Sequence, residues 1–158
     1  MTARVLTISD SCHAGTRVDG SGPAVRERLQ SVGITVDVVE VLPDERALIA
    51  ARLRELADSR AVSVVFTTGG TGVALRDVTP EATADVIERP VPGLGELMRA
   101  EGLKHTPLAA LSRAIAGTRG RTLIVNLPGS PKGAVESLDA ILKLIPHMVR
   151  LLEGQTGH

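Results

Sequence analysis

The stretch AVSVVFTTGGTG, residues 61–72, decides the fold of this chain. Apolar side chains fall on both faces of its first half, as in a central strand of a parallel sheet that is covered by helices on both sides. Gly69, Gly70 and Gly72 then follow, and glycines this dense occur where the backbone must closely approach another group. The stretch therefore predicts a buried parallel strand that ends in a ligand-binding loop, because ligands of such sheets bind beyond the carboxyl ends of the strands.

Short β-branched runs and helical patterns alternate on both sides of this strand. The expected strands are residues 4–8, 34–42, 61–68 and an antiparallel hairpin of 111–117 with 121–127. The expected helices are residues 23–32, 44–59, 79–88 and 92–104, and a last one from Ser130 that restarts at Pro146, with Asp44 and Thr79 as caps. This order predicts one α/β domain over residues 1–158. It is expected to be a three-layer α/β/α sandwich with a mostly parallel sheet plus a small antiparallel hairpin.

The composition excludes several classes of protein. Lys and Arg together number 18 and match 18 Asp and Glu, so no overall field attracts nucleic acid or an anionic membrane. The chain has no Trp or Tyr and one Phe, which leaves no aromatic platform for single-stranded nucleic acid. Cys12 is the single cysteine, and no stretch is apolar for long enough to span a bilayer. We therefore expect a cytoplasmic protein with neither a nucleic-acid nor a membrane partner.

Two glycine-containing loops are placed to bind an anion. TTGGTG (residues 67–72) follows the central strand, and LPGSPKG (residues 127–133) follows the last strand and opens a helix. In the first loop, the amides of Gly69, Gly70 and Gly72 can turn toward one point and form a nest for an anion. Neither common phosphate motif fits the first loop. A P-loop requires Lys and then Ser or Thr where Val73 and Ala74 stand, and the dinucleotide fingerprint requires a glycine at Leu75.

A carboxylate beside a phosphate-binding loop requires a cation to neutralise it. Asp77 follows the first loop and Asp44 follows the second strand, so both are candidate Mg²⁺ ligands for nucleotidyl transfer. Simpler interpretations remain open at this level. The glycines can form tight turns only, Asp44 can be a helix cap, and Asp77 can make an Asx turn before Thr79.

Four stretches of the chain together resemble the molybdopterin adenylyltransferase family (MogA/MoaB type) of molybdenum cofactor biosynthesis. They are TISDSCHAGTRVDGSGP (7–23), TTGGTGVALRDVTPEAT (67–83), PGLGELMR (92–99) and LSRAIAGTRGRTLIVNLPGSPKG (111–133). The resemblance implies a homotrimeric enzyme. In its Mg²⁺-dependent reaction, the terminal phosphate of molybdopterin attacks the α-phosphorus of ATP, giving adenylylated molybdopterin and pyrophosphate. Hand-over of this product to a molybdate-inserting enzyme is also expected.

The resemblance also implies roles for individual residues. Asp44 and Asp77 would serve the metal and catalysis. The substrate- and nucleotide-binding residues would be Ser9, Asp10, Thr68, Gly69, Gly70, Thr71, Gly72, Ser112, Pro128, Gly129 and Ser130. Two alternatives stay open: a non-catalytic trimer that binds or carries molybdopterin, and a nucleotide pyrophosphatase that uses the same loops.

Overall fold

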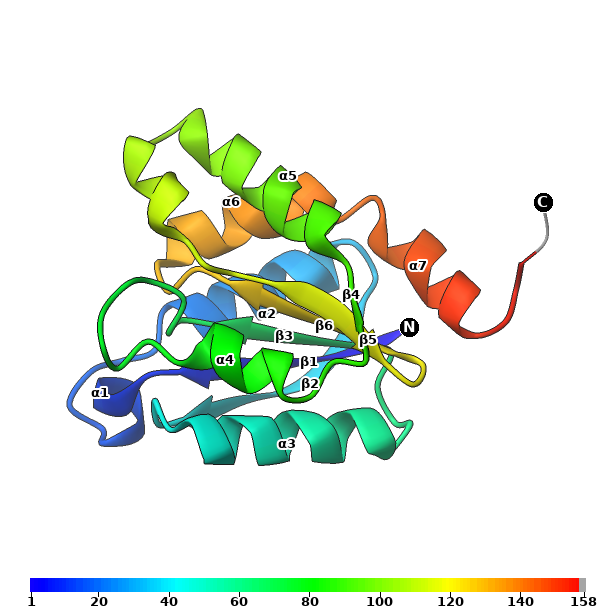
Figure 1. Ribbon diagram of the computed structural model, residues 1–158, viewed down its shortest axis with the longest axis horizontal. Helices are drawn as coiled ribbons and strands as arrows, with labels where there is room; N and C mark the ends of the chain where they lie inside the picture. Colours follow the sequence, from blue (N-terminus) through cyan, green and yellow to red (C-terminus); the bar gives the residue numbers. More distant parts are fainter. Residues whose placement is uncertain (157–158) are drawn as a thin grey trace.

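One mixed six-stranded sheet forms the centre of the molecule (Figure 1), in the order β2-β1-β3-β6-β5-β4. The computed structural model describes residues 1–156, and residues 157–158 of the expected domain lie outside this part. The strands are β1 (Thr2–Ile8), β2 (Thr35–Leu42), β3 (Val64–Thr68), β4 (Arg89–Pro90), β5 (Ala116–Arg119) and β6 (Thr122–Leu127).

The four strands β2, β1, β3 and β6 are parallel, and β5 and β4 complete the sheet as antiparallel strands. Every residue of β3 is buried, as its apolar sequence predicts. The expected hairpin is confirmed as β5 paired with β6, although β5 begins only at Ala116. Because β3 and β6 are neighbours in register, Thr68 lies beside Leu127 and both glycine loops leave the same edge of the sheet.

Helices cover both faces, which confirms the three-layer sandwich (Figure 1). The helices are α1 (Asp10–His13), α2 (Ser21–Ser31), α3 (Arg46–Asp58), α4 (Thr79–Ala84), α5 (Pro92–Leu103), the 3-10 helix η1 (Pro107–Leu111), α6 (Pro131–Ile141) and α7 (Ile145–Leu152). Side chains of α2, α5, α6 and α7 pack with Val64 and Phe66 on one face, while those of α3 and α4 pack with Val65 on the other.

The structure corrects several expected boundaries. The helix from Thr79 ends at Ala84 rather than Glu88, and the short strand β4 follows it. Thr79 is the first helical residue, and Val78 occupies the N-cap position. The hydroxyl of Thr79 does not cap the helix but donates to the carbonyl of Gly69. The sequence does not predict the helices α1 and η1 or the strand β4, since each is too short to show a periodic pattern. No helix in the described part is both long and apolar enough to cross a bilayer.

Candidate functional site

The two glycine loops touch at the carboxyl edge of the sheet, as predicted from their places after β3 and β6. The amide of Gly69 donates to the carbonyl of Leu127 at 3.1 Å. A Cβ on Gly129 would lie 3.3 Å from the Cα of Gly69, so the two chains are in close contact. The loops therefore form one continuous wall.

Gly69 and Gly70 both have positive φ angles, of +91° and +65°, a region that other residues rarely adopt. A Cβ on Gly69 would collide with the carbonyl oxygen of Ile8, and one on Gly70 with the hydroxyl of Thr79. The expected anion nest needs one correction. The amide of Gly69 is already bonded to Leu127, whereas those of Gly70, Thr71, Gly72 and Val73 donate to no acceptor within residues 1–156.

The amino terminus of α6 offers less to an anion than its sequence suggests. The amide of Gly133 donates to the hydroxyl of Ser130 at 3.0 Å, and that of Ala134 donates to the carbonyl of Ser130. Pro131 has no amide hydrogen. Ser130 thus caps its own helix, and the glycine loop after β3 carries most of the free donors.

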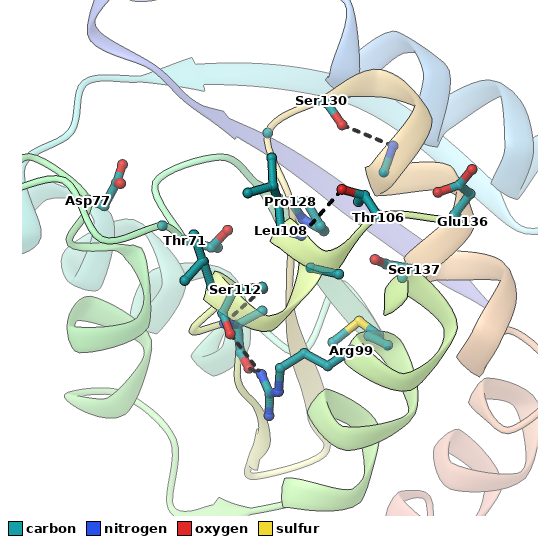
Figure 2. A pocket seen from close by; sticks show the side chains of 18 of the residues that line it. Thr71, Asp77, Arg99, Thr106, Leu108, Ser112, Pro128, Ser130, Glu136 and Ser137 are labelled. Atoms are coloured by element: carbon teal, nitrogen blue, oxygen red, sulfur yellow. Dashed lines mark hydrogen bonds between the residues drawn. The ribbon is translucent and has the colours of Figure 1, made fainter. Parts of the chain in front are cut away.

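Two cavities open on either side of this wall, with volumes of about 480 and 420 Å³. The first lies among α5, η1, α6 and the loop after β3, and Figure 2 shows its side chains. The second lies among the loop after β1, the start of α2 and the end of β2. Both are lined by the same four residues, Gly70, Asp77, Gly129 and Ser130.

The structure brings nearly all the predicted site residues to these two cavities. Those lining the first cavity only are Thr71, Gly72, Ser112 and Pro128. Those lining the second only are Ser9, Asp44, Thr68 and Gly69. Asp10 lines neither cavity, and it lies one hydrogen bond behind Asp44.

Asp44 is not a helix cap. The helix α3 begins two residues later, at Arg46, and its N-cap Glu45 makes no side-chain capping bond. The carboxylate of Asp44 instead accepts the amide of Asp10 at 2.9 Å, and its Oδ1 lies 3.1 Å from the position of a Cβ on Gly70. Burial raises the pKa of Asp44, the bond from Asp10 lowers it, and the negative charges of Asp10 and Asp77 raise it again.

The carboxylate of Asp77 bonds to a residue before it in the chain, whereas the expected Asx turn would bond it to a residue after it. Its Oδ2 accepts the amide of Ala74 at 3.0 Å, three residues before it, and no bond to Thr79 follows. The same oxygen lies 2.8 Å from the position of a Cβ on Gly72. Asp77 therefore supports the glycine loop and also lines both cavities.

Asp44 and Asp77 both line the second cavity, and carboxylates are ligands of the type that Mg²⁺ takes beside phosphate. Both supply hard oxygen ligands, and the negative charge of Asp77 is one of the causes that raise the pKa of Asp44. Within residues 1–156, no group of three or more Asp, Glu, His or Cys side chains converges on a metal-sized point. Two carboxylates are what Mg²⁺ uses when substrate phosphates complete its coordination.

The guanidinium of Arg76 neutralises the carboxylate of Asp10, which lies behind Asp44. Arg76 donates through Nε and Nη2 to Oδ2 of Asp10, at 2.9 and 2.7 Å. These bonds hold the pKa of Asp10 below its ordinary value. Arg76 therefore joins the exposed part of the loop after β3 to the start of α1. Lys132 is largely exposed and lies 3.8 Å from Glu136.

The serine hydroxyls of the site serve mainly the local structure. The Oγ of Ser9 accepts the amide of Cys12 at 3.2 Å and caps α1. The Oγ of Ser112 lies 3.4 Å from the amide of Ala114. In Figure 2, Arg99 reaches from α5 to the backbone beside Ser112, where it donates to the carbonyls of Ser112 and Ala114.

Sequence reasoning missed two polar residues of the site, Arg113 and Asp19. Arg113 donates to the backbone of the glycine loop at Gly72 and at Asp77, and it pairs with Glu81. Asp19 accepts the hydroxyl of Thr7 and the first amides of α2 inside the second cavity. No local pattern indicates Arg113, because its partners are mainly backbone carbonyls far away in the sequence. Asp19 lies two residues before the start of α2, and an aspartate at this spacing is a local signal that could have indicated its bonds to the first amides of the helix.

The chain matches known proteins over nearly its whole length. The family described as a probable molybdopterin binding domain matches residues 4–147. The molybdopterin adenylyltransferase of Helicobacter pylori (strain ATCC 700392 / 26695) is 45% identical over 95% of this chain and 86% of its own. The molybdenum cofactor synthesis protein cinnamon of Drosophila melanogaster is 43% identical over 96% of this chain, which spans only 26% of that protein.

A solved structure agrees with these sequences. The crystal structure of the molybdopterin biosynthesis enzyme MoaB from Thermus thermophilus superposes with a TM-score of 0.91 at 51% identity. It covers 97% of this chain, and this chain covers 96% of it. By sequence and by fold, this chain belongs to the molybdopterin-binding domain family of molybdenum cofactor biosynthesis, which includes the molybdopterin adenylyltransferases.

Proposed function

We propose that the protein transfers AMP from ATP to the terminal phosphate of molybdopterin, in a magnesium-dependent reaction. One observation carries this proposal: two cavities of similar size meet at a single glycine loop, where Gly70 and Asp77 belong to both. A transfer between two phosphate-bearing substrates needs such an arrangement, because both phosphates must reach one point from opposite sides.

The residues of this chain would hold the reacting phosphates in place. The free amides of residues 70–73 would donate to phosphate oxygens and stabilise the charge that develops at phosphorus. An oxygen of the molybdopterin phosphate would attack the α-phosphorus of ATP, and the bond from that phosphorus to the bridging oxygen of pyrophosphate would break. The products balance as adenylylated molybdopterin and pyrophosphate.

Asp44 and Asp77 would hold the magnesium ion beside this loop. When bound, Mg²⁺ supplies positive charge that offsets the phosphates and the two carboxylates. Asp10 and Arg76 fix the position of Asp44 from behind through hydrogen bonds, and Ala74 fixes Asp77. The carboxylates are therefore placed before any ligand binds.

Incubation of the protein with molybdopterin, ATP and Mg²⁺ tests this function. The proposal expects pyrophosphate and adenylylated pterin in equal amounts, and neither product when molybdopterin or Mg²⁺ is omitted. Binding of the pterin without any pyrophosphate would identify a carrier. Release of pyrophosphate or hydrolysis of a dinucleotide without molybdopterin would identify a pyrophosphatase.

We also propose that the protein forms a homotrimer. An open hollow of about 610 Å³ between α5 and α7 supports a subunit contact, since its lining is mostly apolar. The side chains of Leu97 and Leu144, at its rim, are 45% and 41% exposed. Light scattering would give three times the chain mass of 16.5 kDa, and a monomer at micromolar concentration would contradict the trimer.

Its place in the cell follows from the reaction. We propose that the protein acts in the cytoplasm, where ATP and Mg²⁺ are available, and that nucleic acids and membranes are not its partners. An adenylylated pterin is an activated phosphate compound, and we propose hand-over to an enzyme that inserts molybdate.

A further inference from the structure

The carbonyl side of the glycine loop is held entirely by two residues, Thr79 and Arg113. Each of the four carbonyl oxygens of residues 69–72 accepts a hydrogen bond from one of them. The pairs are Thr79 Oγ1 with Gly69 at 2.9 Å, Thr79 N with Gly70 at 3.1 Å, Arg113 N with Thr71 at 2.8 Å and Arg113 Nε with Gly72 at 2.7 Å.

The orientation of these carbonyls fixes the orientation of the amides. In a trans peptide the C=O and the N–H of one unit point in opposite directions, and no peptide bond within residues 1–156 is cis. Because the carbonyls of residues 69–72 point toward α4 or Arg113, the amides of the same peptide units, which belong to residues 70–73, point away from α4 and Arg113. These are the amides without an acceptor in the described chain, and residues 70–72 line the cavities.

Arg113 is itself fixed by contacts at both ends of the loop. Its Nη2 donates to the carbonyl of Asp77 at 2.8 Å, so one guanidinium spans Gly72 and Asp77. Its Nη1 pairs with the carboxylate of Glu81 on α4, and this pairing lowers the pKa of Glu81. A planar guanidinium can make these bonds at once, whereas a lysine ammonium would be too compact to span them.

We propose that Thr79 and Arg113 are positioning residues that orient the loop amides toward phosphate before the substrate arrives. This inference rests on the proposed function, in which phosphate groups bind at residues 70–73. Neither residue contacts substrate in this account. They act by removing the freedom of four peptide units, so that binding does not have to order them.

Calorimetric titration with Mg·ATP and with inorganic pyrophosphate tests the proposal on paired variants of the full chain. Arg113→Lys keeps the charge and loses the span, and we expect both dissociation constants to rise roughly tenfold or more. Arg119→Lys is the matched control. Arg119 also makes a two-pronged bond to a carboxylate, Asp58, and a bond to the carbonyl of Val86, away from both cavities. The Arg119→Lys variant should lose thermal stability as Arg113→Lys does, while its affinities for Mg·ATP and pyrophosphate stay unchanged.

Thr79→Val provides a second route if Arg113→Lys does not fold. It removes the hydroxyl that holds Gly69 and should weaken both titrations, whereas Thr79→Ser should restore most of the lost affinity. Folded Arg113→Lys or Thr79→Val protein that binds both ligands as the unmodified chain does would overturn the positioning role. Failure of the unmodified chain itself to bind Mg·ATP and pyrophosphate would instead overturn the proposed function.

Discussion

Asp10 and Asp44 form a reciprocal pair of hydrogen bonds, in which the main-chain amide of each donates to the side-chain carboxylate of the other at 2.9 Å. The exchange joins the carboxyl ends of β1 and β2, which are neighbouring parallel strands. It keeps Asp44 half-buried beside Gly70, where the charges of Asp10 and Asp77 act on it. A carboxylate whose pKa is raised in this way weakens the fold when it is ionised, and the proposed Mg²⁺ would offset that cost on binding.

Replacing Asp44 by asparagine should therefore stabilise the protein while removing activity. The pKa of Asp44 in the fold lies above its ordinary value of 3.8, so its ionised form weakens the fold at neutral pH. Asparagine keeps an oxygen for the amide of Asp10. We expect the melting temperature at pH 7 to rise by about 1–3 °C, a small gain because solvent screens the half-exposed charge.

The rise in melting temperature of Asp44→Asn should depend on pH. The penalty from Asp44 is absent below its ordinary pKa and complete above its raised one, so the gain should vanish in acid. Asp37→Asn is the control, since Asp37 is exposed on β2, the strand that precedes Asp44. A melting temperature of Asp44→Asn that equals or falls below that of the unmodified protein at pH 7 would contradict the strain assigned to Asp44.

The rate of the reaction should fall in acid at a higher pH than an ordinary aspartate would give. In the proposed mechanism Asp44 holds Mg²⁺ in its ionised form, and burial raises its pKa above 3.8. The positive charge of Arg76 lowers that pKa, so Arg76→Ala should move the acid limb of the kcat/KM profile to higher pH. Lys143→Ala, just beyond the carboxyl end of α6, should leave the profile unchanged. Superimposable limbs for Arg76→Ala and the unmodified enzyme would exclude Asp44 as the titrating group.

Asp77→Asn should abolish most of the turnover and spare the fold. Removal of a charged group that acts on the transition state costs about a hundredfold or more. An asparagine oxygen can still accept the amide of Ala74, so the loop and the melting temperature should change little. Asp85→Asn, which loses only a surface pair with Arg46, serves as the control for activity. Full activity of Asp77→Asn would remove Asp77 from the mechanism.

Gly70→Ala and Gly33→Ala separate the strain of a positive φ from the crowding of the site. Both glycines have positive φ, +65° and +82°, and Gly33 has open space where its Cβ would lie. Each alanine should cost about 1 kcal/mol of stability from φ alone. Gly70→Ala also meets Thr79 and the Oδ1 of Asp44, so it should cost more and lose activity, measured by urea unfolding and by pyrophosphate release. Equal losses of stability and full activity in both variants would argue against a crowded site at Gly70.

The sequence predicts the two glycine loops of the site well, and it predicts the hydrogen bonds between residues far apart in the chain poorly. The ends of β3 and β6 carry glycines that need positive φ or close approach, and these are local requirements that leave a local pattern. The bond from the amide of Gly69 to Leu127 and the exchange between Asp10 and Asp44 join residues far apart in the chain. No spacing rule predicts them, so the sequence alone places Gly69 in the anion nest and allows Asp44 to be a helix cap.

Arg113 shows the same limit most clearly. Its partners are mainly backbone carbonyls, which every residue possesses, so no residue type at a fixed distance indicates its role. The strand β4 and the helix α1 are too short to be stable by themselves, so their formation depends on contacts with the rest of the fold as well as on the local cap of α1 by Ser9.

Binding of phosphate at the glycine loop can be measured by titrating ¹⁵N-labelled protein with Mg·ATP and following its backbone amide resonances. We predict large shifts for the amides of Gly70, Thr71, Gly72 and Val73, and a much smaller one for Gly69, whose amide is bonded to Leu127. Saturation with nucleotide that leaves these four resonances in place would contradict this prediction.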